Sequence, residues 1–210
     1  MKGVILISGR GSNMRSIVEA GTGLDVRAVI SNRPDAPGLE WAASRGLAVK
    51  VVDHKAFPTR EAFDAELARA TDGYGAELVV LAGFMRILTD GFISRYPRRI
   101  VNIHPSLLPS FPGLHTHARA LEAGVKVHGA TVHVVTPALD NGPIVVQGVV
   151  PVMPGDTEER LAGRVLEVEH RIYPEAVRWF VEGKVEFSGD VVRVRDSGVS
   201  TDYLVSPRKP

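Results

Sequence analysis

Near its N-terminus the chain reads Val4-Ile5-Leu6-Ile7-Ser8-Gly9-Arg10-Gly11-Ser12-Asn13. The four apolar residues at the start show no polar alternation, which is typical of a strand buried on both faces of a parallel sheet. The glycine-rich turn and the amphipathic segment after it predict a helix that follows this strand directly. A strand, a tight turn and a helix in this order form the first βα unit of an α/β fold.

The same alternation of short apolar runs and longer amphipathic segments continues down the chain. We expect further strands, each buried on both faces, at residues 26–30, 48–52, 78–81 and 100–103. We expect helices at residues 12–20, 38–45, 60–70 and 89–96. Together these elements predict an α/β fold with a Rossmann-like, mostly parallel twisted sheet that is flanked by helices.

The pattern changes in the C-terminal part of the chain. Residues 129–136 alternate in the manner of a strand, and residues 144–152 follow after a turn at 140–143. A turn between two such segments predicts antiparallel strands at one edge of the sheet. A small hairpin is expected from residues 185–187 and 191–194, which flank a Ser-Gly-Asp turn.

One long helix is expected at residues 157–182, where apolar residues form a single stripe. Asp156 and Glu159 have the spacing of a capping box, with Asp in place of the usual Ser or Thr. Pro174 is expected to kink the helix, because its nitrogen cannot donate a hydrogen bond to the preceding turn.

Length and composition bound the organisation of the chain. Its 210 residues include 44% hydrophobic residues, and 25 Lys and Arg against 24 Asp and Glu leave no general attraction to nucleic acid. We expect one domain over residues 1–195 and a flexible polar tail over residues 196–210. Cysteine is absent, which excludes disulfides and cysteine chemistry. No apolar run is long enough for a signal peptide or a membrane span, so we expect a cytoplasmic protein without membrane partners.

The glycine-rich turn is a candidate anion site, because free N–H groups and the dipole at a helix start favour negative charge. A dinucleotide site would need a small residue at Met14 and an acid near Asn32, and a P-loop would need Gly-Lys-Ser/Thr. The candidate ligand of this turn is therefore a phosphate group that does not belong to a dinucleotide. A tight turn that binds no ligand is equally compatible with this loop, since glycine turns are common in α/β folds.

Asn102 and His104 form the most informative polar pair in the sequence. Residues two apart on a strand share a face, so both side chains point the same way at the carboxyl end of a predicted parallel strand, where α/β sheets bind ligands. An amide and an imidazole can both donate to a carbonyl oxygen that becomes negative. The alternative is that neighbouring backbone groups satisfy both side chains.

Asp140 lies in the turn between the two predicted edge strands. It either forms a local Asx turn or brings a carboxylate to His104 that could accept a proton, and spacing alone leaves both open. His115 and His117 have the spacing of a metal pair, but neither an HExxH motif nor a third ligand accompanies them, so no metal is expected.

Taken together, these motifs resemble the phosphoribosylglycinamide formyltransferase family, the folate-dependent enzymes of purine synthesis. The matching segments keep one order through the chain and are residues 7–13, 81–88, 101–109, 111–117, 128–133, 139–144 and 169–174. The most specific are Val101-Asn102-Ile103-His104-Pro105-Ser106-Leu107-Leu108-Pro109 and Gly113-Leu114-His115-Thr116-His117.

The resemblance implies transfer of a formyl group from the co-substrate 10-formyltetrahydrofolate to the amine of glycinamide ribonucleotide, through a tetrahedral oxyanion. It implies catalytic roles for Asn102, His104 and Asp140. By the same resemblance, the ribonucleotide and its phosphate would be held by Gly11, Ser12, Asn13 and Glu169. The folate would be held by Met85, Arg86, Ile87 and Leu88.

Related families leave alternatives. A formyltetrahydrofolate deformylase would use the same Asn, His and Asp with water as the nucleophile, but it carries an N-terminal regulatory domain. Methionyl-tRNA formyltransferase carries an extra C-terminal domain. The length of the chain and the motif at residues 113–117 favour the purine enzyme. A nucleotide-binding module without catalysis is a third possibility, and Glu169 could be a surface carboxylate paired with an arginine. We expect small-molecule substrates and a monomer or homodimer.

Overall fold

A computed structural model of the chain describes residues 1–197. One sheet contains seven strands in the order β3-β2-β1-β4-β5-β6-β7, and β8 and β9 form a separate hairpin. The strands are β1 (Lys2–Ile7), β2 (Asp25–Ser31), β3 (Val49–Val51), β4 (Leu78–Leu81), β5 (Ile100–His104), β6 (Val127–Val134), β7 (Ile144–Pro151), β8 (Val185–Ser188) and β9 (Val191–Val194). The helices are α1 (Ser12–Glu19), α2 (Pro37–Ser44), α3 (Arg60–Gly73), α4 (Asp90–Arg95), α5 (Thr116–Glu122) and α6 (Glu158–Val181), with a short 3₁₀ turn, η1, at His54–Ala56.

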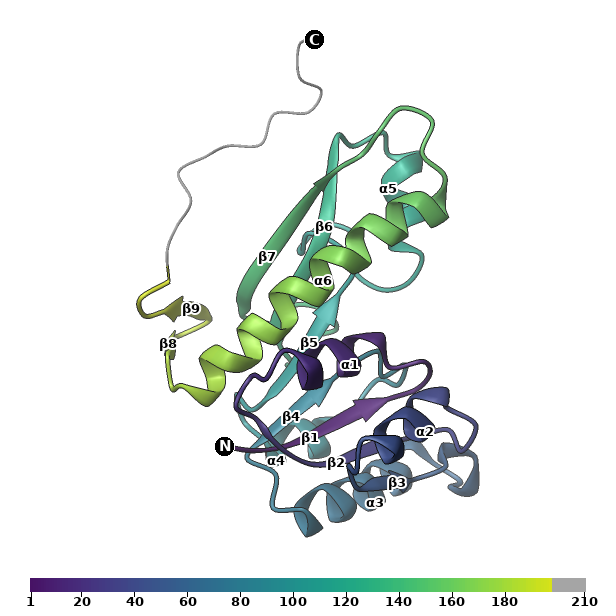
Figure 1. Cartoon of the computed structure of the whole chain (residues 1–210), viewed down its shortest axis with the longest axis vertical. Helices are drawn as coiled ribbons and strands as arrows, with labels where there is room; N and C mark the ends of the chain where they lie inside the picture. The colour runs from purple at the N-terminus through teal and green to yellow at the C-terminus, as the bar shows by residue number, and fades with distance from the viewer. Residues whose placement is uncertain (198–210) are drawn as a thin grey trace.

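Strands β3, β2, β1, β4 and β5 are parallel, whereas β6 pairs antiparallel with both β5 and β7. The expected fold class is therefore confirmed, including the antiparallel strands at one edge. The central strands are apolar on both sides because helices cover both faces. One core cluster lies under α1, α2 and α6, and a second lies under α3 and α4. Figure 1 shows α6 running along the β6–β7 part of the sheet, against which it packs.

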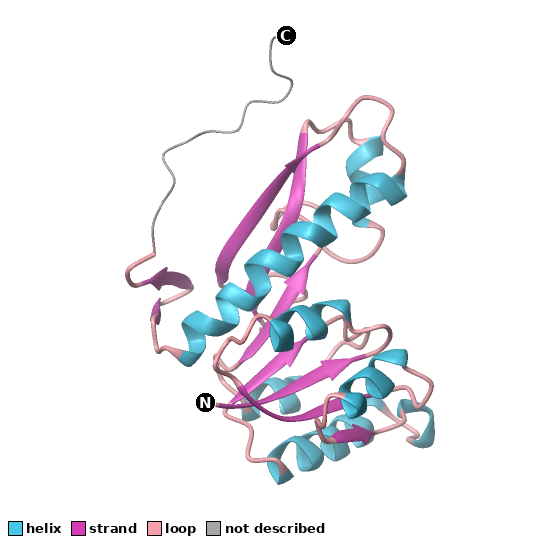
Figure 2. Cartoon of the chain, viewed as in Figure 1, coloured by secondary structure: helices cyan, strands magenta, loops and turns pink. Residues whose placement is uncertain are grey.

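Strands β6 and β7 extend beyond the parallel part of the sheet and carry α5 near their far end (Figure 1). In Figure 2 the long α6 follows this extension and returns to the parallel part, where it lies beside α1. The loops that leave β4 and β5, the β6–β7 turn and the middle of α6 therefore converge near one region of the molecule. The carboxyl edge of β5 lies in that region.

Two expectations about individual elements are wrong. Strand β3 is exposed along its whole length, because it is the edge strand and no neighbour covers its outer side. Thr157, not Asp156, caps α6: its side chain accepts a hydrogen bond from the Arg160 N–H. Asp156 instead forms an ion pair with Arg164. Helix α6 continues from Glu158 to Val181 with Pro174 inside it.

The hairpin of β8 and β9 is confirmed. The domain boundary at residue 195 stays a prediction, and all but the first two residues of the expected tail at 196–210 lie outside the described residues. Among residues 1–197, none of the helices combines the length and the apolar surface that a membrane crossing needs.

Candidate active site

The end of β5 presents Asn102 and His104 on one face of the sheet, as their spacing predicts. The antiparallel register with β6 places His133 opposite Asn102 and Thr131 opposite His104. His104 is buried and Asn102 half-buried. His133 on the neighbouring strand thus adds a third polar side chain to the pair at the end of β5.

Asp140 reaches this group from the β6–β7 turn. Its Oδ2 lies 3.4 Å from His104 Nδ1, and its Oδ1 lies 3.8 Å from His133 Nε2. The Gly113 N–H donates to Asp140 Oδ2 at 2.8 Å, which ties the turn to the loop after β5. Asp140 has a φ of +49°, in the left-handed region that non-glycine residues rarely occupy. The turn therefore brings a carboxylate to the imidazole, as the second of the two interpretations of Asp140 expects.

His133 orients the Asn102 amide, a role that the sequence did not reveal. Burial lowers the pKa of His133, so its neutral form dominates near pH 7. His133 Nδ1 lies 3.2 Å from the Val134 carbonyl oxygen, to which it donates, which leaves Nε2 free to accept from Asn102 Nδ2 at 3.2 Å. One amide N–H of Asn102 is thereby held, and the other is free for a ligand. Only the register of β6 against β5 could have indicated this.

The other ring nitrogen of His104 contacts the loop after β5. Nε2 lies 3.0 Å from the Phe111 carbonyl oxygen, to which it donates. Phe111 has a φ of +55°, so the loop turns sharply at this point. The His104 imidazole therefore lies between a backbone carbonyl oxygen and the Asp140 carboxylate, both of which can accept hydrogen bonds.

The glycine-rich turn forms a second polar group with α6. Gly11 precedes α1 with a φ of +68°, and no side chain caps the helix, so its first N–H groups are open to an anion. Asn13 Nδ2 donates to Glu169 Oε2 at 2.7 Å, although the two residues are 156 positions apart. Glu169 is 7% exposed, which rules out the surface ion pair considered above. Burial raises the pKa of Glu169, and the hydrogen bond from Asn13 lowers it in part.

The predicted folate residues follow β4, and the structure separates them by exposure. Met85 and Ile87 are 68% and 55% exposed, whereas Leu88 belongs to the second core cluster. The Arg86 guanidinium lies 5.9 Å from the centre of the Phe63 ring. Arg86 forms no ion pair within residues 1–197, and its Nε lacks a hydrogen-bond partner there. An uncompensated cation beside exposed apolar side chains fits an anionic, partly apolar ligand.

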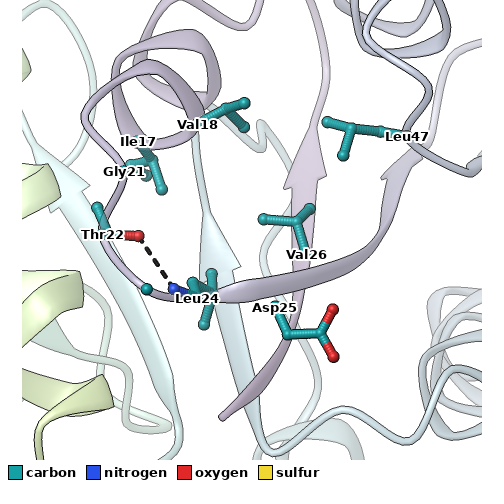
Figure 3. Close-up of a pocket in the computed structure, with 9 residues that line it drawn as sticks. Ile17, Val18, Gly21, Thr22, Leu24, Asp25, Val26 and Leu47 are labelled. Carbon is teal, nitrogen blue, oxygen red and sulfur yellow. Dashed lines mark hydrogen bonds between the residues drawn. The ribbon is translucent and has the colours of Figure 1, made fainter.

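A separate pocket lies beside the end of α1 and the amino end of β2 (Figure 3). It has a volume of about 320 Å³ and is lined by the end of α1, the turn at residues 21–24, the start of β2 and Leu47. In Figure 3 the Thr22 hydroxyl accepts a hydrogen bond from the Leu24 N–H. None of the predicted site residues lines this pocket. Among the described residues, no three His, Asp or Glu side chains come together to hold a metal ion.

Known proteins that are similar to this chain identify its family. The formyl transferase family matches residues 1–177. Phosphoribosylglycinamide formyltransferase of Escherichia coli is 50% identical over 190 residues, which cover 87% of this chain and 88% of that protein. The trifunctional purine biosynthetic protein adenosine-3 of Drosophila melanogaster is 44% identical over 193 residues, which cover 89% of this chain but 14% of that longer protein.

A solved structure agrees with the sequence relatives. Glycinamide ribonucleotide transformylase 1 from Symbiobacterium toebii superimposes with a TM-score of 0.91 at 48% identity, covering 93% of this chain and 94% of that one. The resemblance read from the sequence is confirmed, and the deformylase alternative is not favoured, because these relatives carry transferase names. The chain therefore belongs to the formyl transferase family.

Proposed function

We propose that this chain transfers the formyl group of 10-formyltetrahydrofolate to the primary amine of glycinamide ribonucleotide. The observation that carries the proposal is the convergence of Asn102, His104 and Asp140 at the end of β5, with Asp140 Oδ2 3.4 Å from His104 Nδ1. The amide and imidazole supply donors to a developing oxyanion, and the carboxylate supplies a proton acceptor beside them. Family membership and the names of the relatives support the same reaction.

The reaction begins when the amine nitrogen attacks the formyl carbon. A carbon–nitrogen bond forms, and the formyl oxygen becomes a negatively charged oxyanion. The free N–H of Asn102 donates to this oxygen, because His133 holds the other N–H of the same amide. Protonated His104 gives the stronger, charge-assisted hydrogen bond once the oxyanion replaces one of its present neighbours.

The tetrahedral intermediate then collapses. The attacking nitrogen loses a proton, the carbonyl reforms, and the bond from carbon to folate N10 breaks as N10 takes up a proton. Asp140 stabilises the positive charge on His104, accepts the proton from the attacking amine and passes it to folate N10, directly or through water. Tetrahydrofolate and the formylated amide leave, so charges and atoms balance without a metal or a covalent enzyme intermediate.

The two substrates approach from different elements. Open N–H groups at Gly11 and Ser12 bind the ribonucleotide phosphate, while Asn13 and Glu169 hold its ribose or glycinamide part. The Oδ1 atom of Asn13 is buried and has no partner within residues 1–197, so it can accept a hydrogen bond from this substrate. The folate lies against the segment after β4, with Met85, Ile87 and Leu88 near the pterin and Arg86 near the anionic glutamate tail.

The test is an absorbance assay of folate product formation with purified protein. The wild type is expected to release tetrahydrofolate only when glycinamide ribonucleotide is present. His104→Ala is expected to lower kcat by about 10² to 10³, the usual cost of an oxyanion donor. His170→Gln serves as the control, because His170 lies on α6 outside this group.

Two results would contradict the proposal. Turnover of His104→Ala near the wild-type rate would remove His104 from the reaction. Turnover of the wild type that does not depend on the amine would favour hydrolysis over transfer. The expectations of a monomer or homodimer and of no nucleic-acid partner stay predictions.

A further inference from the structure

We infer that Ser8 is a positioning residue that sets the folate segment (residues 83–88, after β4) against the phosphate-binding turn, with Asn32 and His54 as its support. The inference rests on the proposed function, because it assigns Ser8 to the junction between the two substrate sites. Ser8 directly follows the apolar strand β1 and begins the glycine-rich turn. It is not among the residues assigned above to either substrate.

Ser8 holds the segment after β4 at two points. Its backbone N–H donates to the Gly83 carbonyl oxygen at 3.1 Å, and its Oγ accepts from the Met85 N–H at 2.8 Å. Gly83 has a φ of +77°, so the chain turns sharply between these two contacts. Met85 is the first of the predicted folate residues. The position of the Met85 backbone therefore depends on the side chain of the residue that follows β1.

The orientation of the Ser8 hydroxyl is determined by Asn32. A serine hydroxyl has one hydrogen to donate and lone pairs with which to accept. Ser8 Oγ donates that hydrogen to Asn32 Oδ1 at 2.6 Å, which leaves a lone pair directed to the Met85 N–H. Ser8 and Asn32 are both buried, so water does not compete for these bonds. The hydroxyl is thus fixed as an acceptor for Met85.

Asn32 is in turn fixed by His54. His54 Nδ1 donates to the Asn32 backbone carbonyl oxygen at 2.8 Å, and the Asn32 Nδ2 atom lies 3.2 Å from the same ring nitrogen. The His54 ring packs edge-on against Phe63, with centroids 6.5 Å apart, and the same Phe63 ring lies under the Arg86 guanidinium. Both ends of this series of contacts therefore reach the folate segment: His54 through Phe63 and Arg86, and Ser8 through the Met85 N–H.

The topology explains why these residues meet. Ser8 follows β1, Asn32 follows β2, His54 follows β3 and Met85 follows β4. These four strands are parallel neighbours, so their carboxyl ends lie at one edge of the sheet. The position of Asn32 is where a dinucleotide-binding fold would carry its acidic ribose ligand. In this chain the residue there binds Ser8 instead of a ribose.

Removal of the Ser8 hydroxyl leaves the Met85 N–H and Asn32 Oδ1 without partners, while the β1 backbone is unchanged. The folate segment then loses one of its two anchors, whereas the phosphate-binding N–H groups of α1 keep theirs. A positioning role therefore predicts an effect on one substrate only. A purely structural role would lower stability without this selectivity.

The experiment compares Ser8→Ala, Ser8→Cys and Thr71→Val in steady-state kinetics of the full chain with both substrates varied. Thr71 is the matched control: it is buried in α3, and its hydroxyl donates only to the Leu67 carbonyl oxygen. Ser8→Ala is expected to raise the KM for 10-formyltetrahydrofolate about tenfold, the factor that one lost hydrogen bond typically costs. The KM for the ribonucleotide is expected to stay within about twofold.

Ser8→Cys keeps a side chain of similar size with a weak acceptor, so its effect should be smaller than that of Ser8→Ala. Amide hydrogen exchange at Met85 in the ligand-free protein should become faster in Ser8→Ala and not in Thr71→Val. Equal rises in both KM values, or a loss of thermal stability with neither KM changed, would overturn the inference while the proposed function stands. A wild type that transfers no formyl group would overturn the proposed function first, and the inference with it.

Discussion

The buried carboxyl group of Glu169 opposes folding when it is ionised, and the proposed function assigns it to ribonucleotide binding. Burial raises the pKa of its carboxyl above the ordinary value of 4.5, since desolvation disfavours the charged form. The folded state then binds the proton more tightly than the unfolded state. Stability contributed by this residue is therefore present below the unfolded pKa and is lost as pH rises through the folded pKa. The ionised form of this buried carboxyl opposes folding, because burial removes its charge from water.

Replacement of Glu169 by Gln tests both of these effects. Glu169→Gln removes the buried charge but keeps an oxygen that can accept from Asn13. We expect an equal or higher Tm at pH 7, with the gain shrinking as pH falls toward the unfolded pKa. The KM for the ribonucleotide should rise by about 10- to 100-fold, because hydrogen bonds to a charged group are the stronger ones. Glu175→Gln, an exposed position on the same helix, is the control, and a lower Tm for Glu169→Gln would contradict this account.

At the scale of elements, α6 carries the site residue Glu169 and also holds the ends of β4 and β5, which position other site residues. Tyr173 lies one turn after Glu169 and is fully buried. Its hydroxyl lies 3.0 Å from the Leu81 carbonyl oxygen and 3.0 Å from that of Val101, and donates its one hydrogen between them. Leu81 ends β4, and Val101 precedes Asn102 in β5. The helix therefore holds together the two strand ends that position the folate segment and the catalytic amide.

Tyr173→Phe is expected to weaken this lock without disturbing the packing of the ring. Two backbone carbonyls would lose a buried donor, and the free energy of unfolding should fall by about 1–3 kcal/mol. Denaturant unfolding followed by circular dichroism measures the change. Tyr74→Phe, in which the phenol is only half-buried, should change it by less than about 0.5 kcal/mol. Equal effects of the two substitutions would show that the Tyr173 hydroxyl contributes no specific lock.

At the scale of the whole molecule, buried and half-buried histidines contribute to the response to acid. Burial lowers the pKa of His117, His128, His133 and His170. The pKa of His128 falls to about 4, through burial first and the neighbouring His117 second. His128 is 1% exposed, and neither ring nitrogen has a hydrogen-bond partner within residues 1–197. Between the unfolded pKa of 6.5 and about 4, the unfolded state binds the extra proton, so stability rises with pH across this window.

Acid unfolding should follow from this linkage. We expect the free energy of unfolding to fall as pH drops from about 6.5 to about 4, with His128 alone contributing roughly 3 kcal/mol. His128→Leu should flatten the pH profile, because an apolar side chain loses no hydrogen bond there. Urea unfolding at a series of pH values gives the measurement. His115→Leu, at an exposed position, should keep the wild-type slope, and an unchanged slope for His128→Leu would contradict the assignment.

The elements themselves were largely predictable. Strand β4 has the predicted bounds, and the predicted start of α3 at Arg60 is also correct, because burial patterns and periodicity are local properties. The exposure of β3 was not predictable, since it follows from the position of that strand at the edge of the sheet. The cap of α6 was misassigned by one residue. Thr157 and Asp156 are both good capping residues, but the Asp156 carboxylate is engaged elsewhere, by the ion pair to Arg164 and by the Met153 N–H.

The sequence by itself determined the βα units, the glycine-rich turn, and the pairing of Asn102 with His104 on one face of a strand. Each of these depends on residues within one turn or one strand, where spacing dictates direction. Only the tertiary structure decided that Glu169 meets Asn13, that Asp140 reaches His104, and that His133 and Ser8 orient their neighbours. These contacts join segments far apart in the chain, and they depend on strand order and helix packing, which no local pattern encodes.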